Sequence, residues 1–134
     1  MTTYTGYVGA LADMVVTGVR RRYAWPPAAI NSSDLPAQWP QLPSGDEQLL
    51  MHGTDNGGDL TLSCQLVVAL APVAQNTQEA NFTDTVTMLD NLTIALRALA
   101  DAAFGPLTWT IQMGSVSVAG HDYWAVLATV KAMA

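Results

Sequence analysis

The segment from Trp25 to Pro43 constrains the fold of this chain more than any other stretch. It reads WPPAAINSSDLPAQWPQLP and holds five of the seven prolines and two of the four tryptophans. Proline fixes φ, lacks a backbone N–H and pushes the preceding residue out of the helical region. The segment is therefore expected to form neither a helix nor an inner strand. Because disordered linkers are poor in aromatic residues, residues 25–45 are expected to form an ordered arm that packs on a protein surface.

The composition indicates a protein whose surface is partly covered by other chains. The length of 134 residues predicts a single domain, 1–134. Only 12% of the residues are charged and 50% are hydrophobic, whereas an ordinary soluble protein has about 25% charged residues. A small monomer needs a charged coat to stay in solution. We therefore expect identical copies or other partners to cover part of this surface.

Several protein classes are disfavoured by the same sequence. The longest apolar run, residues 66–74, contains Pro72 and is shorter than the roughly 20 residues of a membrane-spanning helix. The N-terminus has no basic residue before its apolar stretch, so we expect no secretory signal. The single cysteine, Cys64, excludes an internal disulfide and is typical of a reducing cytoplasm. A net charge of −6 with five basic residues disfavours a nucleic-acid-binding protein.

Two helices are predicted from apolar residues spaced three and four apart. The first runs from Tyr4 to about Val19, with Thr2 or Thr3 as its cap, and three arginines at its C-terminal end would suit the helix dipole. The second covers residues 82–104 and stops at Gly105-Pro106. Its predicted buried stripe is Phe82, Val86, Leu89, Leu92, Leu96, Leu99 and Ala103.

Two hairpins are predicted from alternating strands joined by turn sequences, one over residues 47–71 and one over residues 107–133. A turn at Gly57-Gly58 in the first hairpin would place Leu49 opposite Leu66. Gly120-His121-Asp122 would supply the turn of the second. The expected fold is α+β, with one antiparallel sheet built of two hairpins, covered by two helices, and a long proline-rich arm after the first helix.

Three groups of residues are candidates for a catalytic or metal site. His52 and Cys64, with Asp55 or Asp59, could form a nucleophilic pair. The preferred register pairs His52 with Ser63 and puts it on the face opposite Cys64, but a three-residue turn would bring the two together. The acidic turn 55–59 has Leu66 where a calcium loop needs a carboxylate. His121-Asp122 has no further ligand near it in the sequence. We therefore expect no enzyme, no catalytic residue, no metal and no cofactor.

The best candidates for a functional surface are basic and aromatic residues near the arm. The three arginines could meet an acidic patch on a neighbouring copy, because the guanidinium group bonds carboxylates bidentately, or they could simply be solvated. The two tryptophans could fold back on their own sheet or lie between subunits, where tryptophan is enriched. The predicted subunit interface consists of Arg20, Arg21, Arg22, Trp25, Leu35 and Trp39.

The element order, the length and three phrases, YAWPPAAI, DLPAQWPQLP and the closing YWAVLATV, resemble the tail terminator proteins of long-tailed bacteriophages, also called tail completion or head-tail joining proteins. The resemblance covers almost the whole chain. It implies an α+β subunit that forms a homohexameric ring on the tail tube, stops tube growth and presents a surface to the head-side connector. It also implies assembly in the host cytoplasm, a final place in the virion, and no catalytic residues.

The acidic balance agrees with this expectation, because a negatively charged ring would keep DNA that passes through its lumen from adhering to the wall. No sequence-specific nucleic-acid partner and no membrane partner are expected. Two alternatives stay open. One is another neck protein, a stopper or adaptor. The other is a small ligand- or peptide-binding α+β module in which the arm would be a lid over the sheet.

Overall fold

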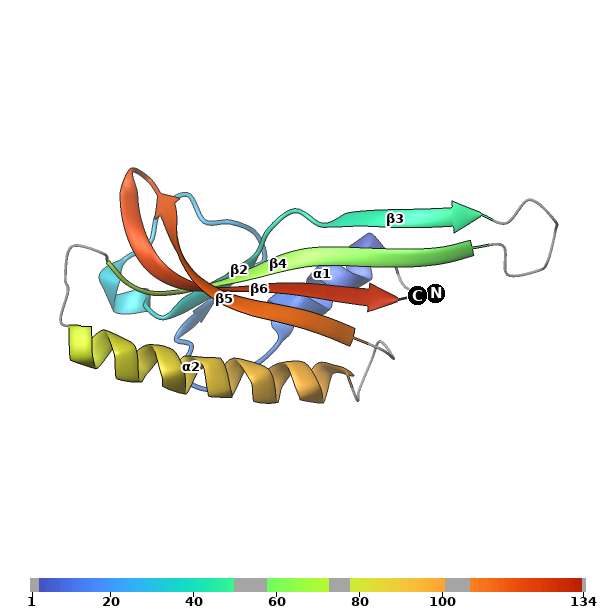
Figure 1. Ribbon diagram of the computed structural model, residues 1–134. Coiled ribbons are helices and arrows are strands. Elements are labelled where there is room, and N and C mark those ends of the chain that lie inside the picture. The colour runs from blue at the N-terminus through green and yellow to red at the C-terminus, as the bar shows by residue number, and fades with distance from the viewer. Residues whose placement is uncertain (1–2, 50–57, 73–77, 101–106, 134) are drawn as a thin grey trace.

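The computed structural model describes residues 3–49, 58–72, 78–100 and 107–133. A mixed sheet of six strands is accompanied by two helices (Figure 1). In chain order the elements are α1 (Tyr4–Asp13), β1 (Arg21–Arg22), the 3₁₀ helix η1 (Ser32–Asp34), β2 (Ala37–Pro40), β3 (Ser44–Leu49), β4 (Gly58–Pro72), α2 (Gln78–Leu99), β5 (Leu107–Val118) and β6 (His121–Met133).

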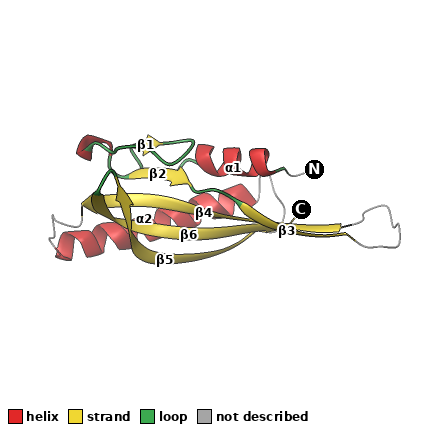
Figure 2. Cartoon of the chain, turned by 90° about the horizontal axis from the view of Figure 1, so that it is seen from above, coloured by secondary structure: helices red, strands yellow, loops and turns green. Residues whose placement is uncertain are grey.

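The predicted α+β class is confirmed, and the predicted antiparallel sheet needs one correction. The strand order is β1-β2-β4-β6-β5, with β3 pairing β4 beside β2. Most pairs are antiparallel, but β1 runs parallel to β2, so the sheet is mixed. This parallel pair arises because the chain leaves β1, passes through η1 and returns in the same direction (Figure 2).

The 15-residue strand β4 organises the core because both of its faces are covered. Alternate residues from Leu62 to Val68 face a cluster that also contains buried side chains of both helices. This alternation agrees with the expected pattern. Val67 and Ala69 face a second cluster, which contains Leu35 and Trp39. One side of the sheet is thus covered by the helices and the other by the proline-rich segment.

Helix α1 is shorter than predicted. Thr3 caps it by accepting a hydrogen bond from the Gly6 N–H at 3.1 Å, and the helix ends at Asp13 with Met14 in an extended conformation. Met14 and Val16 are both buried, so the chain beyond the helix alternates like a strand. The arginines are therefore not in the last turn of a helix, and two of them form β1. Nevertheless, the Arg22 guanidinium donates to the Asp13 carbonyl at 2.6 Å and satisfies one end of α1.

The expectation that the proline-rich segment contains no inner strand is wrong. Strand β2 lies between β1 and β4, and Tyr23 N–H donates to Gln38 O at 2.8 Å. Proline is tolerated because Pro36 precedes this four-residue strand and Pro40 ends it, where a missing N–H matters least. The segment does not form a separate arm, because much of it packs against its own sheet.

The predicted register of the first hairpin is also wrong. Leu49 pairs with Gly58 rather than with Leu66, and Ser44 pairs with Ser63. The physical reason is competition for one edge of β4, because Pro40 of β2 already pairs with Leu66. Strand β3 therefore pairs with the N-terminal part of β4. His52 and Asp55 lie outside the described residues.

Strands β5 and β6 form the second hairpin, with a turn that differs from the expected one. Ala119 and Gly120 both have positive φ, 54° and 79°, as a two-residue type I′ turn requires. His121 and Asp122 belong to β6 and pair with Val118 and Ser117.

Helix α2 begins before the predicted start, and the predicted stripe is confirmed only in part. Leu92 and Leu96 are buried, and Leu89 and Leu99 pack against the same core, whereas Phe82 and Val86 are exposed. The buried face also includes Met88 and Ala95, so it is turned around the helix axis relative to the predicted stripe. Ala103 lies outside the described residues.

Candidate functional site

The three consecutive arginines are exposed, but their side chains have different partners. Arg20 donates weakly from Nη1 to Ser33 O at 3.5 Å. The guanidinium of Arg21 lies 5.2 Å from the centre of the Tyr23 ring, a cation–π contact. Arg22 bonds the end of α1, as described above. The triplet is therefore a row of exposed cations, each with a local contact.

The three apolar residues of the predicted interface divide into one exposed and two buried side chains. Trp25 is 73% exposed. Trp39 is only 2% exposed and meets the Tyr23 ring edge-on, with 6.5 Å between ring centres. Leu35 is buried in the same cluster. Trp39 and Leu35 therefore fold back on the sheet of their own chain. Of the predicted interface, only Trp25 and the three arginines are accessible to another chain.

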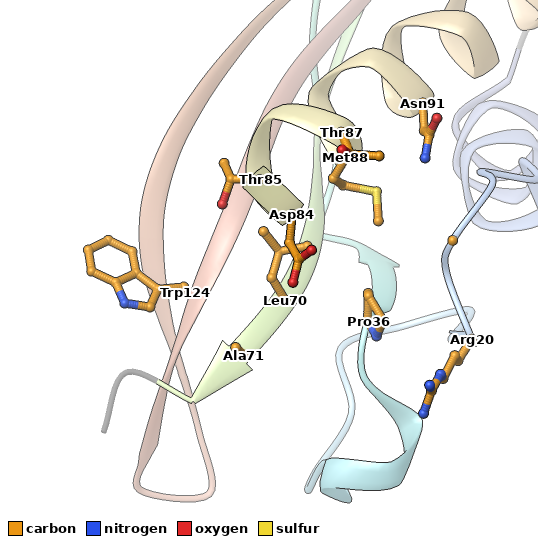
Figure 3. A pocket seen from close by; sticks show the side chains of 11 residues that line it. Arg20, Pro36, Leu70, Ala71, Asp84, Thr85, Thr87, Met88, Asn91 and Trp124 are labelled. Carbon is orange, nitrogen blue, oxygen red and sulfur yellow. The ribbon is translucent and has the colours of Figure 1, made fainter. Parts of the chain in front are cut away.

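A cavity of about 330 Å³ lies beside Arg20 (Figure 3). Its apolar lining includes Leu70 of β4, Met88 of α2 and Trp124 of β6. Asp84 extends into it from α2, and Arg20 borders it from the segment before β1. A cavity of this kind, apolar with opposite charges at two places, has the size and chemistry of a small binding site.

One contact holds two walls of the cavity together. The Asn91 side-chain amide of α2 donates to the Thr17 carbonyl at 2.9 Å. The segment around Arg20 is thereby tied to the helix. Sequence reasoning singled out Arg20 alone as a candidate here. The other residues that line the cavity come from α2, β4, β6 and the segments before β1 and β2, so no local pattern could have marked them as one site.

Cys64, the candidate nucleophile, is a buried thiol. It is 2% exposed, and its Sγ donates to Gln41 O at 3.2 Å. Burial raises its pKa to about 11. A thiol is a poor nucleophile while it stays protonated. Tyr7 lies in the same core cluster, donates its hydroxyl to Val130 O at 2.5 Å, and also has a pKa raised by burial.

The buried thiol predicts a loss of stability at alkaline pH. Its pKa is about 11 in the folded chain, against an ordinary value of 9.0. Below pH 9 the thiol is protonated in both states. Between these values the unfolded chain loses the proton first, so the free energy of unfolding falls as the pH rises.

Between pH 7 and pH 11, the free energy of unfolding of Cys64→Ala is expected to fall by about 2–3 kcal/mol less than that of the parent chain. The reason is that each unit of pKa difference between the folded and unfolded states corresponds to about 1.4 kcal/mol. Urea unfolding of both proteins at several pH values from 7 to 11 measures the difference. If the free energy of unfolding changes with pH in the same way in both proteins, the pKa of Cys64 is not raised by burial and the prediction is wrong.

The remaining candidates do not gather into a metal centre. Within the described ranges, no three His, Cys, Asp or Glu side chains lie close enough together to hold a metal ion. Asp59 lies in β4, and His121 and Asp122 are exposed at the start of β6. Neither described helix has the length and apolarity to cross a membrane.

The geometry therefore contains three separate features: the arginine row with Trp25, the cavity beside Arg20, and the buried Cys64. Comparison with known proteins adds no identification, because no protein-family model matches this chain and no curated protein has a matching sequence.

Proposed function

We propose that this chain is a tail terminator of a long-tailed bacteriophage, whose subunits form a homohexameric ring that caps the tail tube and joins it to the head-side connector. The observation that carries the proposal is the number of large apolar side chains left exposed in a chain with few charges. An exposed apolar side chain gains free energy when a neighbouring chain covers it, and the low charge of this chain fits a surface that is covered in this way. These side chains are Tyr4, Val15, Trp25, Leu42, Phe82, Val86, Ile94 and Met113.

The partners follow from this proposal. They are further copies of the chain, the tail tube protein and the head-side connector or stopper protein. DNA passes through the lumen without sequence-specific contacts, which agrees with the net charge of −6. The place of the protein is the neck of the virion, after assembly in the host cytoplasm.

Mixing the purified chain with tail tubes and imaging by negative stain tests the function. The expected result is a ring at one end of each tube and no further tube growth from that end. Binding to the connector but not to the tube would instead assign the chain to the stopper or adaptor proteins. Folded protein that binds neither would refute the proposal.

Trp25 is the side chain expected to contribute most to the subunit contact among the proposed residues, because it is a large aromatic that is 73% exposed. Trp25→Ala is expected to raise the concentration of chain needed to cap half of the tubes by at least about tenfold, the effect of a residue worth roughly 1.4 kcal/mol or more. Asn31→Ala is the control, because Asn31 is an exposed polar residue of the same segment and is not among the apolar side chains that the ring is proposed to cover. An equal effect of both substitutions would argue against a specific role of Trp25.

The cavity beside Arg20 favours a second candidate, a small ligand- or peptide-binding module. Light scattering, which measures the size of the particles with and without tail tubes, distinguishes the terminator from the binding module. A chain that stays monomeric at all concentrations, ignores tubes and is stabilised by a small zwitterion such as a free amino acid would favour the module.

A further inference from the structure

Strand β5 forms one edge of the sheet and has an unusual composition for that position. It spans 12 residues, pairs with β6 without a break from Leu107 to Val118, and has no strand on its other side among the residues that the structure describes. It contains no charged residue and no proline. A row of backbone N–H and C=O groups is thus left without a neighbouring strand.

Edge strands are normally protected against pairing with other chains. Short length, lysine, proline and bulges are the usual devices. Strand β5 has none of them, and its exposed side chains include Thr108, Thr110 and Gln112, which are polar but uncharged. Another strand could therefore pair with this edge without electrostatic repulsion and in a regular register.

The opposite edge of the sheet is formed by β1 and, alongside the N-terminal part of β4, by β3, which offers a partner strand. Strand β3 pairs with β4, and its hairpin extends beyond both helices (Figures 1 and 2). Both β3 and β6 run antiparallel to β4, and β5 runs antiparallel to β6. Consequently β3 and β5 point in opposite directions. A second copy placed edge to edge, with its sheet facing the same way, would bring its β3 against β5 in the antiparallel sense.

The charges favour pairing of β3 with β5 over pairing of β3 with β3 of another copy. Strand β3 contains Asp46 and Glu47, so two β3 strands side by side would bring acidic residues together. Pairing of β3 with the uncharged β5 avoids this repulsion. Because the contact joins β5 of one copy to β3 of the next, a pair of subunits still has one unpaired β3 and one unpaired β5. Further copies can therefore add in the same way until a ring closes.

We propose that β5 of one copy pairs antiparallel with β3 of the next copy, so that the sheet continues from subunit to subunit. This inference rests on the proposed ring, for which it supplies a second contact between neighbouring subunits. This β5–β3 seam lies at the sheet edges and adds to the contact proposed at Trp25 and the arginines.

Cysteine cross-linking tests the pairing directly, in a Cys64→Ala background. Thr110→Cys is combined in turn with Asp46→Cys, Glu47→Cys or Gln48→Cys, which detects the three registers that place Thr110 opposite one of these positions. Mild oxidation is expected to give a ladder of linked chains ending at the size of the ring. Efficient dimers from Thr110→Cys alone would mean that β5 pairs with β5 and would overturn the proposal.

Charge at the edge gives an independent measurement. The double variant Thr110→Lys/Gln112→Lys is expected to raise the concentration for half-assembly by at least tenfold, because lysine protects an edge from pairing. Thr83→Lys/Ala98→Lys adds the same charge at exposed positions of α2 and serves as the control. Circular dichroism shows whether each variant is folded. Unchanged assembly of a folded β5 variant would overturn the proposal.

The seam and the terminator function can fail separately. Capped tubes without β5–β3 links would refute the seam and leave the terminator function standing. Linked rings that ignore tail tubes would support the seam and refute that function. A chain that stays monomeric even on tubes would refute both.

Discussion

Replacing Trp39 with alanine is expected to lower the free energy of unfolding by about 3–5 kcal/mol, the range for a large buried aromatic side chain. Trp39 is 2% exposed and belongs to the core on the sheet face away from the helices. Its substitution removes the edge-on contact with Tyr23 and leaves a cavity over Val67 and Ala69 of β4. Because β2 is only four residues long, few other contacts can compensate.

Trp25→Ala is the matched control for this prediction. The two tryptophans lie in the same proline-rich segment, but Trp25 is 73% exposed. Its substitution is expected to change stability by no more than about 0.5 kcal/mol, as for most surface positions. Urea unfolding followed by circular dichroism, at a concentration where the chain is monomeric, measures both. Equal losses would contradict the division of the segment into a buried and an exposed part.

Leu92→Ala is expected to cost about 2–5 kcal/mol, because Leu92 is fully buried in the cluster between α2 and the sheet. The side chain packs in the same core as Leu11 of α1 and Leu66 of β4. The substitution improves helix propensity slightly, so the loss measures tertiary packing. Loss of α2 docking would also expose the sheet face that the helices cover.

Ile94→Ala provides the comparison within the same helix. Ile94 is 64% exposed, so its substitution is expected to stay within about 0.5 kcal/mol of the parent. Thermal and urea unfolding of the two variants measure the difference. A larger loss for Ile94 than for Leu92 in the monomer would mean that α2 presents a different face to the sheet.

The α+β class and the strand alternation of β4 could be predicted because both depend on local patterns. Alternate apolar residues from Leu62 to Val68 indicate a strand wherever that strand lies in the fold. The turn before β6 was predicted one or two residues too late, since the local sequence offers both Ala119-Gly120 and Gly120-His121.

The register of β3 could not be predicted from its own hairpin. Leu49 opposite Leu66 satisfies every local rule, but the position opposite Leu66 belongs to Pro40. Likewise, Val15 and Val19 continue the helical spacing of α1, while burial of Met14 and Val16 ends that helix at Asp13. In both cases a contact distant in sequence overrides a local preference.

The candidate site shows the same division. Sequence reasoning selected Trp25, Leu35 and Trp39 together, because all three are large apolar residues among prolines. Only the sheet face that receives them separates the exposed Trp25 from the other two. The cavity beside Arg20 combines residues from five parts of the chain, which no local pattern connects.

Local patterns in the chain predict the α+β class, the general places of the helices and most strands, and a surface with few charges. Contacts between elements distant in the sequence set the register of β3, the burial of Trp39, the exposure of Trp25 and, within the described residues, the unpaired edge of β5. Periodicity shows which residues favour burial, whereas the element that buries them depends on which strands pair with β4 and which segments pack on its faces.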